Sequence, residues 1–296
     1  MNLPSKLWSW RGYNIAYQSQ GDRGPAVVLI HGFGANWRHW RKNIPSISEH
    51  YRCYALDLIG FGESAKPSPQ EVGYTMETWG DQVADFCREI VQGPVYLIGN
   101  SIGCVVALQT VVDHPELYEG LMLINCSLRL LHDRRRQSLP WYKQVSSTLL
   151  QRVLENKAIG HFFFDRIAQP KVIKNILGQA YCDHTAITPE LIDILYRPSQ
   201  DEGAADVFLA FTAYSQGPLP EDLLPQLQIP CRILWGEQDP WEPIALGRAY
   251  GEYATVDQFI SLPQVGHCPQ DEAPDVVNPL ILEWLGSQSV TPSPAA

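Results

Sequence analysis

Short apolar runs recur along the chain, separated by longer stretches in which apolar residues keep helical spacing. The runs predict six buried strands, at 26–30, 52–57, 95–99, 121–125, 231–235 and 258–262. A representative helical stretch is Met76 to Val91. Strands that alternate with helices form a parallel sheet covered by helices on both faces. The pattern therefore predicts an α/β fold with a mostly parallel central sheet flanked by helices.

The segment before the first buried strand has a different pattern. Residues 7–24 alternate polar with aromatic or apolar residues, and the segment closes on Gly21 and Gly24. Alternation with period two, bounded by glycine, is typical of strands joined by turns. We expect an antiparallel hairpin that leads into the sheet.

Between Cys126 and Cys231 the strand signal disappears and helical spacing replaces it, as in Trp141, Val145, Leu149, Leu150, Val153 and Leu154. We therefore predict a core domain made of 1–127 and 217–286, with an inserted helical cap at 128–216. An insertion between neighbouring strands lies above their carboxyl ends, where α/β proteins place their sites. The polar, proline-containing residues 287–296 are expected to form a flexible tail.

Composition narrows the classes of protein. The apolar runs are far shorter than the roughly 20 residues of a membrane-spanning helix, and the first ten residues lack the apolar core of a signal peptide, so we expect a soluble, cytoplasmic protein. Seven scattered cysteines without a Cys-x-x-Cys pair indicate reduced thiols, most of them in the core. With 22 Lys and Arg against 32 Asp and Glu, the net charge of −10 argues against nucleic acid as a partner.

No cofactor is predicted. The Gly-x-Gly pairs in "LIHGFG" and "DLIGFGES" do not continue to the third glycine of a dinucleotide fingerprint. The histidines do not pair at metal-ligand spacing, so we predict no metal site.

The most informative short stretch is "VYLIGNSIGC" at 95–104, where a strand turns at once into a helix around Ser101. Gly-x-Ser-x-Gly is typical of a sharp turn that exposes a nucleophilic serine, because its glycines allow a strained backbone. A serine that merely caps the helix N-terminus is the alternative, and this pentapeptide alone does not separate the two.

Three more stretches follow buried strands: His31-Gly32-Phe33-Gly34, Asp239 in "WGEQDP", and His267 in "GHCPQ". Each alone is a weak signal, since Asp239 could start a turn and His267 could be one loop histidine of eight. Together they place serine, acid and histidine in the order of an α/β-hydrolase triad, each at a strand's carboxyl end.

This chemistry assigns a role to each residue. His267 would remove the proton of Ser101, and Asp239 would hold the histidine tautomer and stabilise the imidazolium. The backbone N–H groups of Phe33 and Ile102 would stabilise the oxyanion, at roughly 3 kcal/mol per donor. His31 is expected to brace its turn, and an amide at Asn125, where some relatives carry the acid, favours Asp239.

On these motifs the chain resembles the capped α/β-hydrolases over nearly its whole length. The residues that carry the resemblance are His31-Gly32-Phe33-Gly34, "DLIGFGES", "GNSIG", "WGEQDP" and "GHCPQDEAP". Serine at position 101 separates it from the relatives that use aspartate, the haloalkane dehalogenases and epoxide hydrolases.

A narrower resemblance comes from "AYCDHTAITPELI" at 180–192 and "GHCPQDEAPDVVN" at 266–278, which are similar to the pheophytinase and chlorophyll dephytylase group. That group cleaves the phytyl ester of chlorophyll pigments. The resemblance implies a carboxylic ester hydrolase of chlorophyll catabolism, for which any magnesium belongs to the pigment. It also allows peripheral contact with a photosynthetic membrane or with pigment–protein complexes.

An apolar ester substrate needs an apolar cleft between cap and core. The predicted substrate-binding residues are Gly34, Trp37, Trp141, Phe163 and Trp241, with Phe33, Ile102, Phe162 and Phe164 as further candidates. Three consecutive phenylalanines cannot all face one way on a helix, so at least one must point elsewhere.

Two other functions stay open at this point. A carbon–carbon bond hydrolase of meta-cleavage type uses the same triad, and a ligand-binding protein of this fold could keep the triad with little turnover. The physiological substrate and the oligomeric state are not determined by the sequence.

Overall fold

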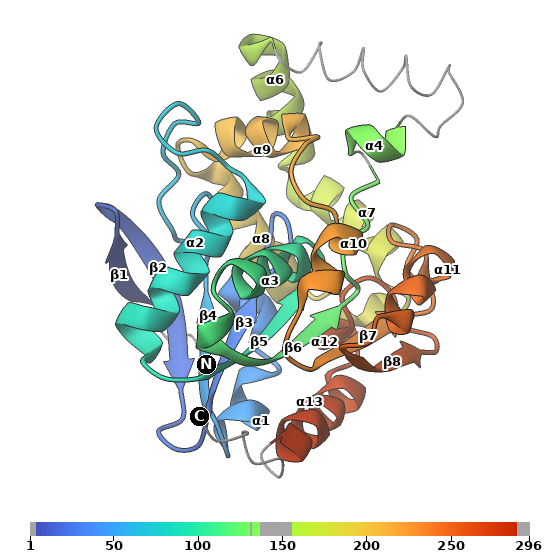
Figure 1. Cartoon of the computed structure of the whole chain (residues 1–296). Helices are drawn as coiled ribbons and strands as arrows, with labels where there is room; N and C mark the ends of the chain where they lie inside the picture. The colour runs from blue at the N-terminus through green and yellow to red at the C-terminus, as the bar shows by residue number, and fades with distance from the viewer. Residues whose placement is uncertain (1–3, 131, 137–155, 289–296) are drawn as a thin grey trace.

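A computed structural model describes residues 4–130, 132–136 and 156–288 of the chain. Its centre is an eight-stranded sheet with strand order β1-β2-β4-β3-β5-β6-β7-β8 (Figure 1). The strands are β1 (Lys6–Trp10), β2 (Tyr13–Gln20), β3 (Ala26–Ile30), β4 (Arg52–Leu56), β5 (Val95–Asn100), β6 (Tyr118–Ile124), β7 (Cys231–Gly236) and β8 (Val256–Leu262).

The pairing confirms the predicted fold class. Strand β2 runs antiparallel to β1 and to β4, which gives the expected N-terminal hairpin, and every other neighbouring pair is parallel. The central strands β3 and β5 are buried along their whole length, because helices cover both faces. Each of the six predicted buried strands corresponds to one of β3 to β8.

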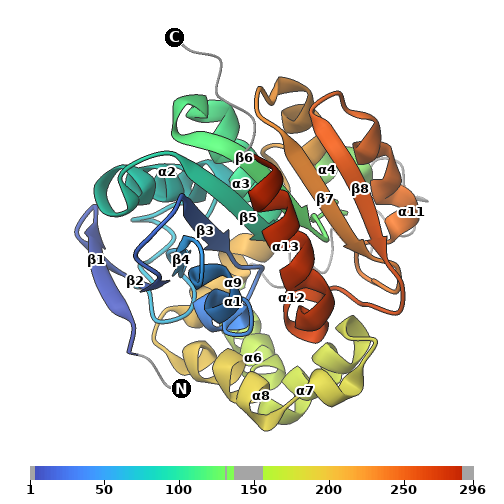
Figure 2. The same cartoon turned by 90° about the horizontal axis from the view of Figure 1, so that it is seen from below.

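Helices cover the sheet on both faces (Figures 1 and 2). One face packs against α2 (Met76–Phe86), its continuation η2 (Cys87–Val91) and α3 (Ile102–Asp113). The other face packs against η1 (Trp37–Trp40), α1 (Ile44–Ser48) and α13 (Pro274–Gln288). Thr75 caps the N-terminus of α2, and its hydroxyl accepts the N–H of Thr78. Helix α13 continues two residues into the segment expected to be a tail.

Every regular element that the structure describes between β6 and β7 is a helix. Its helices are α4 (Asp133–Arg136), α6 (Lys157–Ile167), α7 (Pro170–Ala180), η4 (His184–Ala186), α8 (Pro189–Tyr196), η5 (Arg197–Gln200), α9 (Ala204–Ala213), α10 (Pro220–Leu223) and η6 (Leu224–Gln226). No strand occurs between 128 and 216 in the described part of that segment. The apolar stripe from Trp141 to Leu154 lies outside the described residues.

Four short helices remain in the part of the chain that the structure describes. The first, η3 (Pro115–Leu117), precedes β6; α11 (Ile244–Gly247) and η7 (Arg248–Glu252) lie between β7 and β8; and α12 (Pro269–Glu272) follows β8. Among the described residues no helix is both long enough and apolar enough to cross a membrane. All seven cysteines are free thiols and six of them are buried, as predicted; Cys182 is exposed.

Candidate active site

Ser101 lies at the junction of β5 and α3 in a strained backbone conformation. Its φ of 56° and ψ of −121° lie in a region that residues with a side chain rarely adopt, at a cost of about 1–3 kcal/mol. The serine stands at the N-cap position of α3, but its side chain makes no capping hydrogen bond. The helix-cap interpretation of Ser101 is therefore wrong. The strained turn is the one expected around a nucleophilic serine.

The two glycines of the motif are required by close backbone contacts. A Cβ atom on Gly99 would lie 2.5 Å from the carbonyl oxygen of Gly103, and one on Gly103 would lie 2.5 Å from the carbonyl oxygen of Ile30. Real Cβ atoms are not found at such distances from backbone, so any larger residue would force β3, β5 and α3 apart. The glycine spacing thus lets the turn around Ser101 pack tightly against the sheet.

Asp239 and His267, from the loops after β7 and β8, are in direct contact. Nδ1 of His267 lies 2.7 Å from Oδ2 of Asp239, and both side chains are buried. Oδ1 of Asp239 accepts the backbone N–H groups of Trp241 and Glu242. Burial alone would raise the pKa of Asp239, but the hydrogen bond and charge of His267, with further hydrogen bonds, hold it below its ordinary value.

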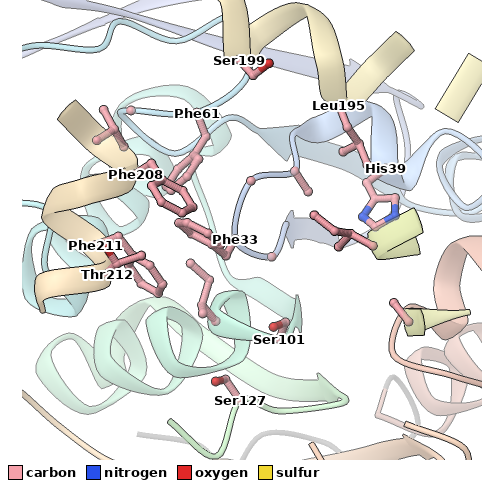
Figure 3. Close-up of a pocket in the computed structure, with 18 of the residues that line it drawn as sticks. Phe33, His39, Phe61, Ser101, Ser127, Leu195, Ser199, Phe208, Phe211 and Thr212 are labelled. Atoms are coloured by element: carbon pink, nitrogen blue, oxygen red, sulfur yellow. The ribbon is translucent and has the colours of Figure 1, made fainter. Parts of the chain in front are cut away.

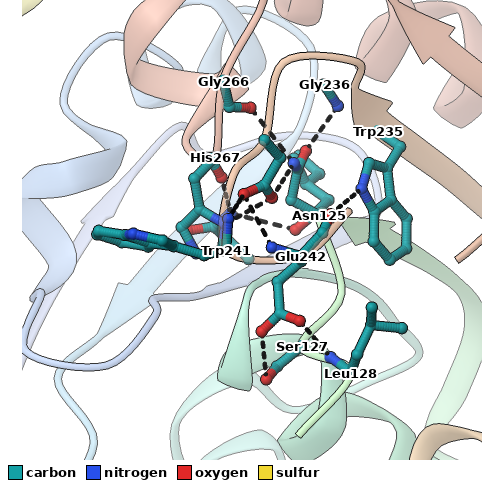
Figure 4. A network of polar contacts seen from close by, with 12 residues as sticks. Asn125, Ser127, Leu128, Trp235, Gly236, Trp241, Glu242, Gly266 and His267 are labelled. Atoms are coloured by element: carbon teal, nitrogen blue, oxygen red, sulfur yellow. Dashed lines mark hydrogen bonds and ion pairs between the residues drawn. The ribbon is translucent and has the colours of Figure 1, made fainter. Parts of the chain in front are cut away.

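Asn125, just past the end of β6, fixes the second oxygen of Asp239. Its Nδ2 donates to Oδ2 of Asp239 at 2.6 Å, while its Oδ1 accepts the N–H of Gly236 at 2.9 Å (Figure 4). Because the amide oxygen is already bound to an N–H group, the NH₂ group must face Asp239. Asn125 therefore orients the Asp239 carboxylate and does not take its place beside His267.

Ser101 and His267 line the same cavity. The preceding residue Asn100 donates from Nδ2 to the carbonyl oxygen of His267 at 3.2 Å, which ties the two loops together. Among the described residues the Ser101 hydroxyl makes no hydrogen bond, so the serine–histidine contact is not formed in this state. Such contacts are often long without substrate and tighten when it binds.

The His31–Gly34 turn lies beside Ser101. A Cβ atom on Gly32 would be 3.1 Å from Cβ of Ser101. His31 contacts Gly32 O through Nδ1 at 2.7 Å and accepts the N–H of Leu58 at Nε2, so the ring is neutral and braces the turn as expected. Burial lowers the pKa of His31 to about 4, which keeps it neutral. Within the described chain, neither the Phe33 nor the Ile102 N–H donates a hydrogen bond to the protein.

A cavity of about 590 Å³ opens above Ser101 and is lined mainly by apolar side chains. Of the residues that the sequence proposed for the cleft, Phe33, Gly34, Ile102 and Trp241 line it. Figure 3 shows an aromatic wall that the sequence did not reveal, in which Phe208 and Phe211 of α9 lie next to Phe33. The rings of Phe33 and Phe211 stack with their centroids 4.3 Å apart. The ring of Trp241 lies 4.9 Å from that of His267.

Two predicted substrate-binding residues, Trp37 and Phe163, do not line the cavity. Trp37 is buried in the cluster that packs η1, α1 and α13 against the sheet, and its backbone and indole N–H groups donate to Asp57 and Ser5. Phe163 faces outward and is 39% exposed; its neighbour Phe164 lines the cavity instead, since adjacent helical residues point in different directions. Trp141 lies outside the described residues.

Glu242 is a site residue that the sequence reasoning missed. Its carboxylate lines the cavity and accepts the Ser127 hydroxyl and the Leu128 N–H, each at 2.9 Å (Figure 4). Burial raises the pKa of Glu242 to about 7, although its hydrogen bonds and the nearby His267 oppose the shift. The only sequence signal for Glu242 was its position three residues after Asp239, because a turn at that spacing brings both side chains to the same site.

The Glu242→Gln variant should weaken the dependence of stability on pH. A folded-state pKa of about 7 against an ordinary 4.5 means that the protonated carboxyl stabilises the fold fully below pH 4.5 and that this contribution is lost as pH rises through 7. The wild type should therefore lose about 1–3 kcal/mol relative to the variant across this range, measured by urea unfolding. Glu237→Gln, at a half-buried residue of the same loop, is the control. Parallel wild-type and Glu242→Gln curves would contradict the assignment.

The fold and this geometry define a hydrolase of the α/β class. Residues 27–280 match the alpha/beta hydrolase family, and the chain belongs to that family. It is 26% identical to the chloroplastic pheophytinase of Arabidopsis thaliana over 88% of this chain and 61% of that protein, so it spans less than two thirds of that relative.

Two further comparisons cover nearly the whole chain. One is the 2-hydroxy-6-oxo-6-(2'-aminophenyl)hexa-2,4-dienoic acid hydrolase of Metapseudomonas resinovorans, 25% identical over 94% of this chain and 89% of that one. The other is the solved structure of a thermophilic esterase from Thermogutta terrifontis, with a TM-score of 0.75 and 25% identity, covering 97% of this chain and 99% of that one. These proteins are named for different substrates.

Proposed function

We propose that the protein hydrolyses carboxylic esters of apolar substrates, with Ser101 as nucleophile, His267 as general base and Asp239 as the acid that orients it. The observation that carries the proposal is the 2.7 Å contact between His267 Nδ1 and Asp239 Oδ2 in the same cavity as the strained Ser101. Structural ion pairs also join histidine to aspartate, but they rarely adjoin a strained serine in an apolar cavity.

The first half-reaction forms an ester with the enzyme. Nε2 of His267 takes the hydroxyl proton while Oγ of Ser101 bonds to the substrate's carbonyl carbon, and Asp239 stabilises the imidazolium. The resulting oxyanion accepts hydrogen bonds from the free N–H groups of Phe33 and Ile102. The carbon–oxygen bond to the alcohol then breaks, and His267 returns its proton to the leaving oxygen.

The second half-reaction regenerates the serine. His267 takes a proton from water, whose oxygen attacks the acyl carbon, and the proton passes to Ser101 Oγ as the acid is released. The same two N–H groups serve both tetrahedral intermediates.

The helical segment 128–216 acts in this proposal as a cap over the core domain formed by 1–127 and 217–286. Core residues such as Ser101 and Phe33 line the cavity together with Phe164, Leu177 and Phe208 from the helical segment. A long apolar chain buried between them gains about 0.8 kcal/mol per CH₂ group. The cap thus favours large apolar esters over acetyl esters.

The specific substrate we propose is the phytyl ester of chlorophyll or pheophytin. It is supported by the mainly apolar cavity and by the similarity to the Arabidopsis pheophytinase. The test incubates purified protein with pheophytin and, separately, with chlorophyll, and measures the dephytylated pigment and free phytol. Release of both products by the wild type and not by Ser101→Ala supports the proposal. No release from either pigment, together with hydrolysis of long-chain p-nitrophenyl esters, would leave only the general esterase.

Phe211→Ala should reduce activity selectively on long-chain esters. The variant removes a ring that stacks on Phe33 in the cavity wall, so a long chain loses contacts that an acetyl group never makes. We expect kcat/KM to fall about tenfold for a palmitoyl or phytyl ester and less than about twofold for the acetyl ester. Phe162→Ala is the matched control, because that ring is 60% exposed outside the cavity. Equal losses on both esters would argue against a binding role for the aromatic wall.

A carbon–carbon bond hydrolase is the second candidate, favoured by the similarity to the hexadienoic acid hydrolase of Metapseudomonas resinovorans. Assay of a meta-cleavage dienoate beside the esters separates the two activities. A burst of p-nitrophenol from an activated ester excludes a binding protein without turnover.

A further inference from the structure

A stripe of exposed apolar side chains runs along the outer side of helix α6. Ile159, Phe162 and Phe163 are 46%, 60% and 39% exposed, and their spacing of three and four residues puts them on one side of the helix. Figure 1 shows α6 at the top of the molecule, beyond α9 and far from the sheet. The inner side of α6 carries the buried Phe164, which lines the cavity. The helix is therefore apolar on two sides, although only the inner one is buried.

This grouping of exposed apolar residues differs from the rest of the described surface. Other large apolar residues that are exposed, such as Leu7, Leu246 and Val276, belong to separate elements. Helix α7, which follows α6, adds Ile176, which is 37% exposed and also lines the cavity, so exposed apolar surface and cavity wall meet at this residue. Single exposed apolar residues are ordinary, whereas grouped ones mark a binding surface.

The same two helices carry positive charge in an acidic protein. Their exposed cations are Lys157, Arg166, Lys171 and Lys174. Asp165 is the one acidic residue from 156 to 180, in a chain whose net charge is −10. Lys157 is paired with Asp206, but the other three cations form no ion pair with a described residue. The guanidinium of Arg166 lies 4.9 Å from the ring centre of Phe162, so a cation stands directly beside the apolar stripe.

We propose that this face of α6 and α7 docks on a membrane that contains anionic lipids. Apolar side chains flanked by Lys and Arg are typical of helices that lie in the headgroup region, where the apolar residues insert and the cations meet phosphate groups. A second copy of the chain fits the stripe less well, because a stable protein interface buries about 800 Å² on each partner. Three side chains that are 39–60% exposed offer a fraction of that area, and the net charge of −10 makes two copies repel each other.

The inference goes beyond ester hydrolysis, because it concerns where the protein binds and not what it cleaves. Docking through α6 sets the cavity beside the lipid, since Phe164 of the same helix and Ile176 of α7 line it. An apolar substrate dissolved in the membrane then has a short path to the cavity, with little exposure to water.

The first test is sedimentation of the purified protein with vesicles in the absence of any ester. We expect wild-type binding to be about tenfold stronger on phosphatidylcholine vesicles with roughly 30% phosphatidylglycerol than on phosphatidylcholine alone, and to weaken with added salt. Phe162→Ala should lower binding to the mixed vesicles about tenfold, because the ring no longer inserts. Leu7→Ala is the matched control, since Leu7 is 63% exposed on β1, and this variant should bind as the wild type does.

A second pair of variants tests the cations. The double variant Lys171→Gln and Lys174→Gln should lower binding to the mixed vesicles about tenfold and binding to pure phosphatidylcholine less than about twofold. The control is the double variant Lys6→Gln and Arg248→Gln, which removes the same charge from exposed positions of β1 and η7 and should leave binding unchanged. Thermal unfolding checks that all four variants are folded, which we expect because every substituted side chain is exposed.

Wild-type protein that stays in solution with both kinds of vesicle would overturn the docking surface. Binding that persists in both the Phe162→Ala and the double lysine variant would overturn it too, because the membrane would then contact another face. Self-association of the wild type that Phe162→Ala abolishes, measured by analytical ultracentrifugation, would assign the stripe to a second copy of the chain instead. Ester hydrolysis is measured separately, so its absence would overturn the proposed function and leave the docking surface standing.

Discussion

Ser101→Ala is expected to lower turnover of any ester by about 10⁴- to 10⁶-fold while leaving the fold intact. The reason is that Oγ forms the covalent bond on which both half-reactions depend, and no other group can replace it. Stability should change little, because alanine meets the same backbone strain at a φ of 56° and the serine hydroxyl makes no hydrogen bond within the described chain. Steady-state kinetics and thermal unfolding measure the two effects.

The matched control is Ser127→Ala. Ser127 is a second serine of the same cavity, and its backbone N–H donates to the carbonyl oxygen of Ser101 in either variant. Its loss should reduce turnover far less, since its hydroxyl donates to the Glu242 carboxylate and accepts the N–H of Arg129. If Ser127→Ala removed the p-nitrophenol burst and Ser101→Ala kept it, the nucleophile would have to be reassigned.

Local physical chemistry explains why so much of the sheet and the elbow could be predicted from the sequence. Buried parallel strands need continuous apolar runs, so "AVVLI" and "VYLIG" predict β3 and β5 without knowledge of their partners. The glycines around Ser101 are equally local, because the turn needs small residues whatever surrounds it. The order of the strand ends then limited the candidates for Asp239 and His267.

The cavity wall could not be predicted because it depends on contacts between distant residues. The sequence proposed Trp37 as a binding residue, but hydrogen bonds to Asp57 and Ser5, which come from separate segments, hold it in the core. Phe163 and Phe164 are indistinguishable by composition, and only the packing of α6 against α9 selects the second. The Tyr181 hydroxyl is hydrogen-bonded to His39, 142 residues before it, and to Asp271, 90 residues after it, so no pattern along the chain indicates these contacts.

Asp239→Asn should reduce kcat by about 10⁴-fold at neutral pH, although it changes a single atom. Oδ1 of Asp239 already accepts two backbone N–H groups, so the asparagine would keep its oxygen there and turn its NH₂ group toward His267. That group donates to Nδ1 and drives the histidine proton onto Nε2. A histidine in this tautomer cannot take the proton of Ser101.

Asn125 makes the same substitution costly for the fold. Its own NH₂ group faces the site of Oδ2 and cannot rotate away, because its oxygen is held by the N–H of Gly236. Two donors would then face each other in a buried site, and we expect urea unfolding to show a loss of about 1–3 kcal/mol. Glu237→Gln, on the same loop as Asp239, should change neither kcat nor the free energy of unfolding. Near-normal turnover in Asp239→Asn would show that another carboxylate is the acid, and Glu237, Glu242 and Asp271 would be tested next. The contact between His267 and Asp239 would then be a structural ion pair.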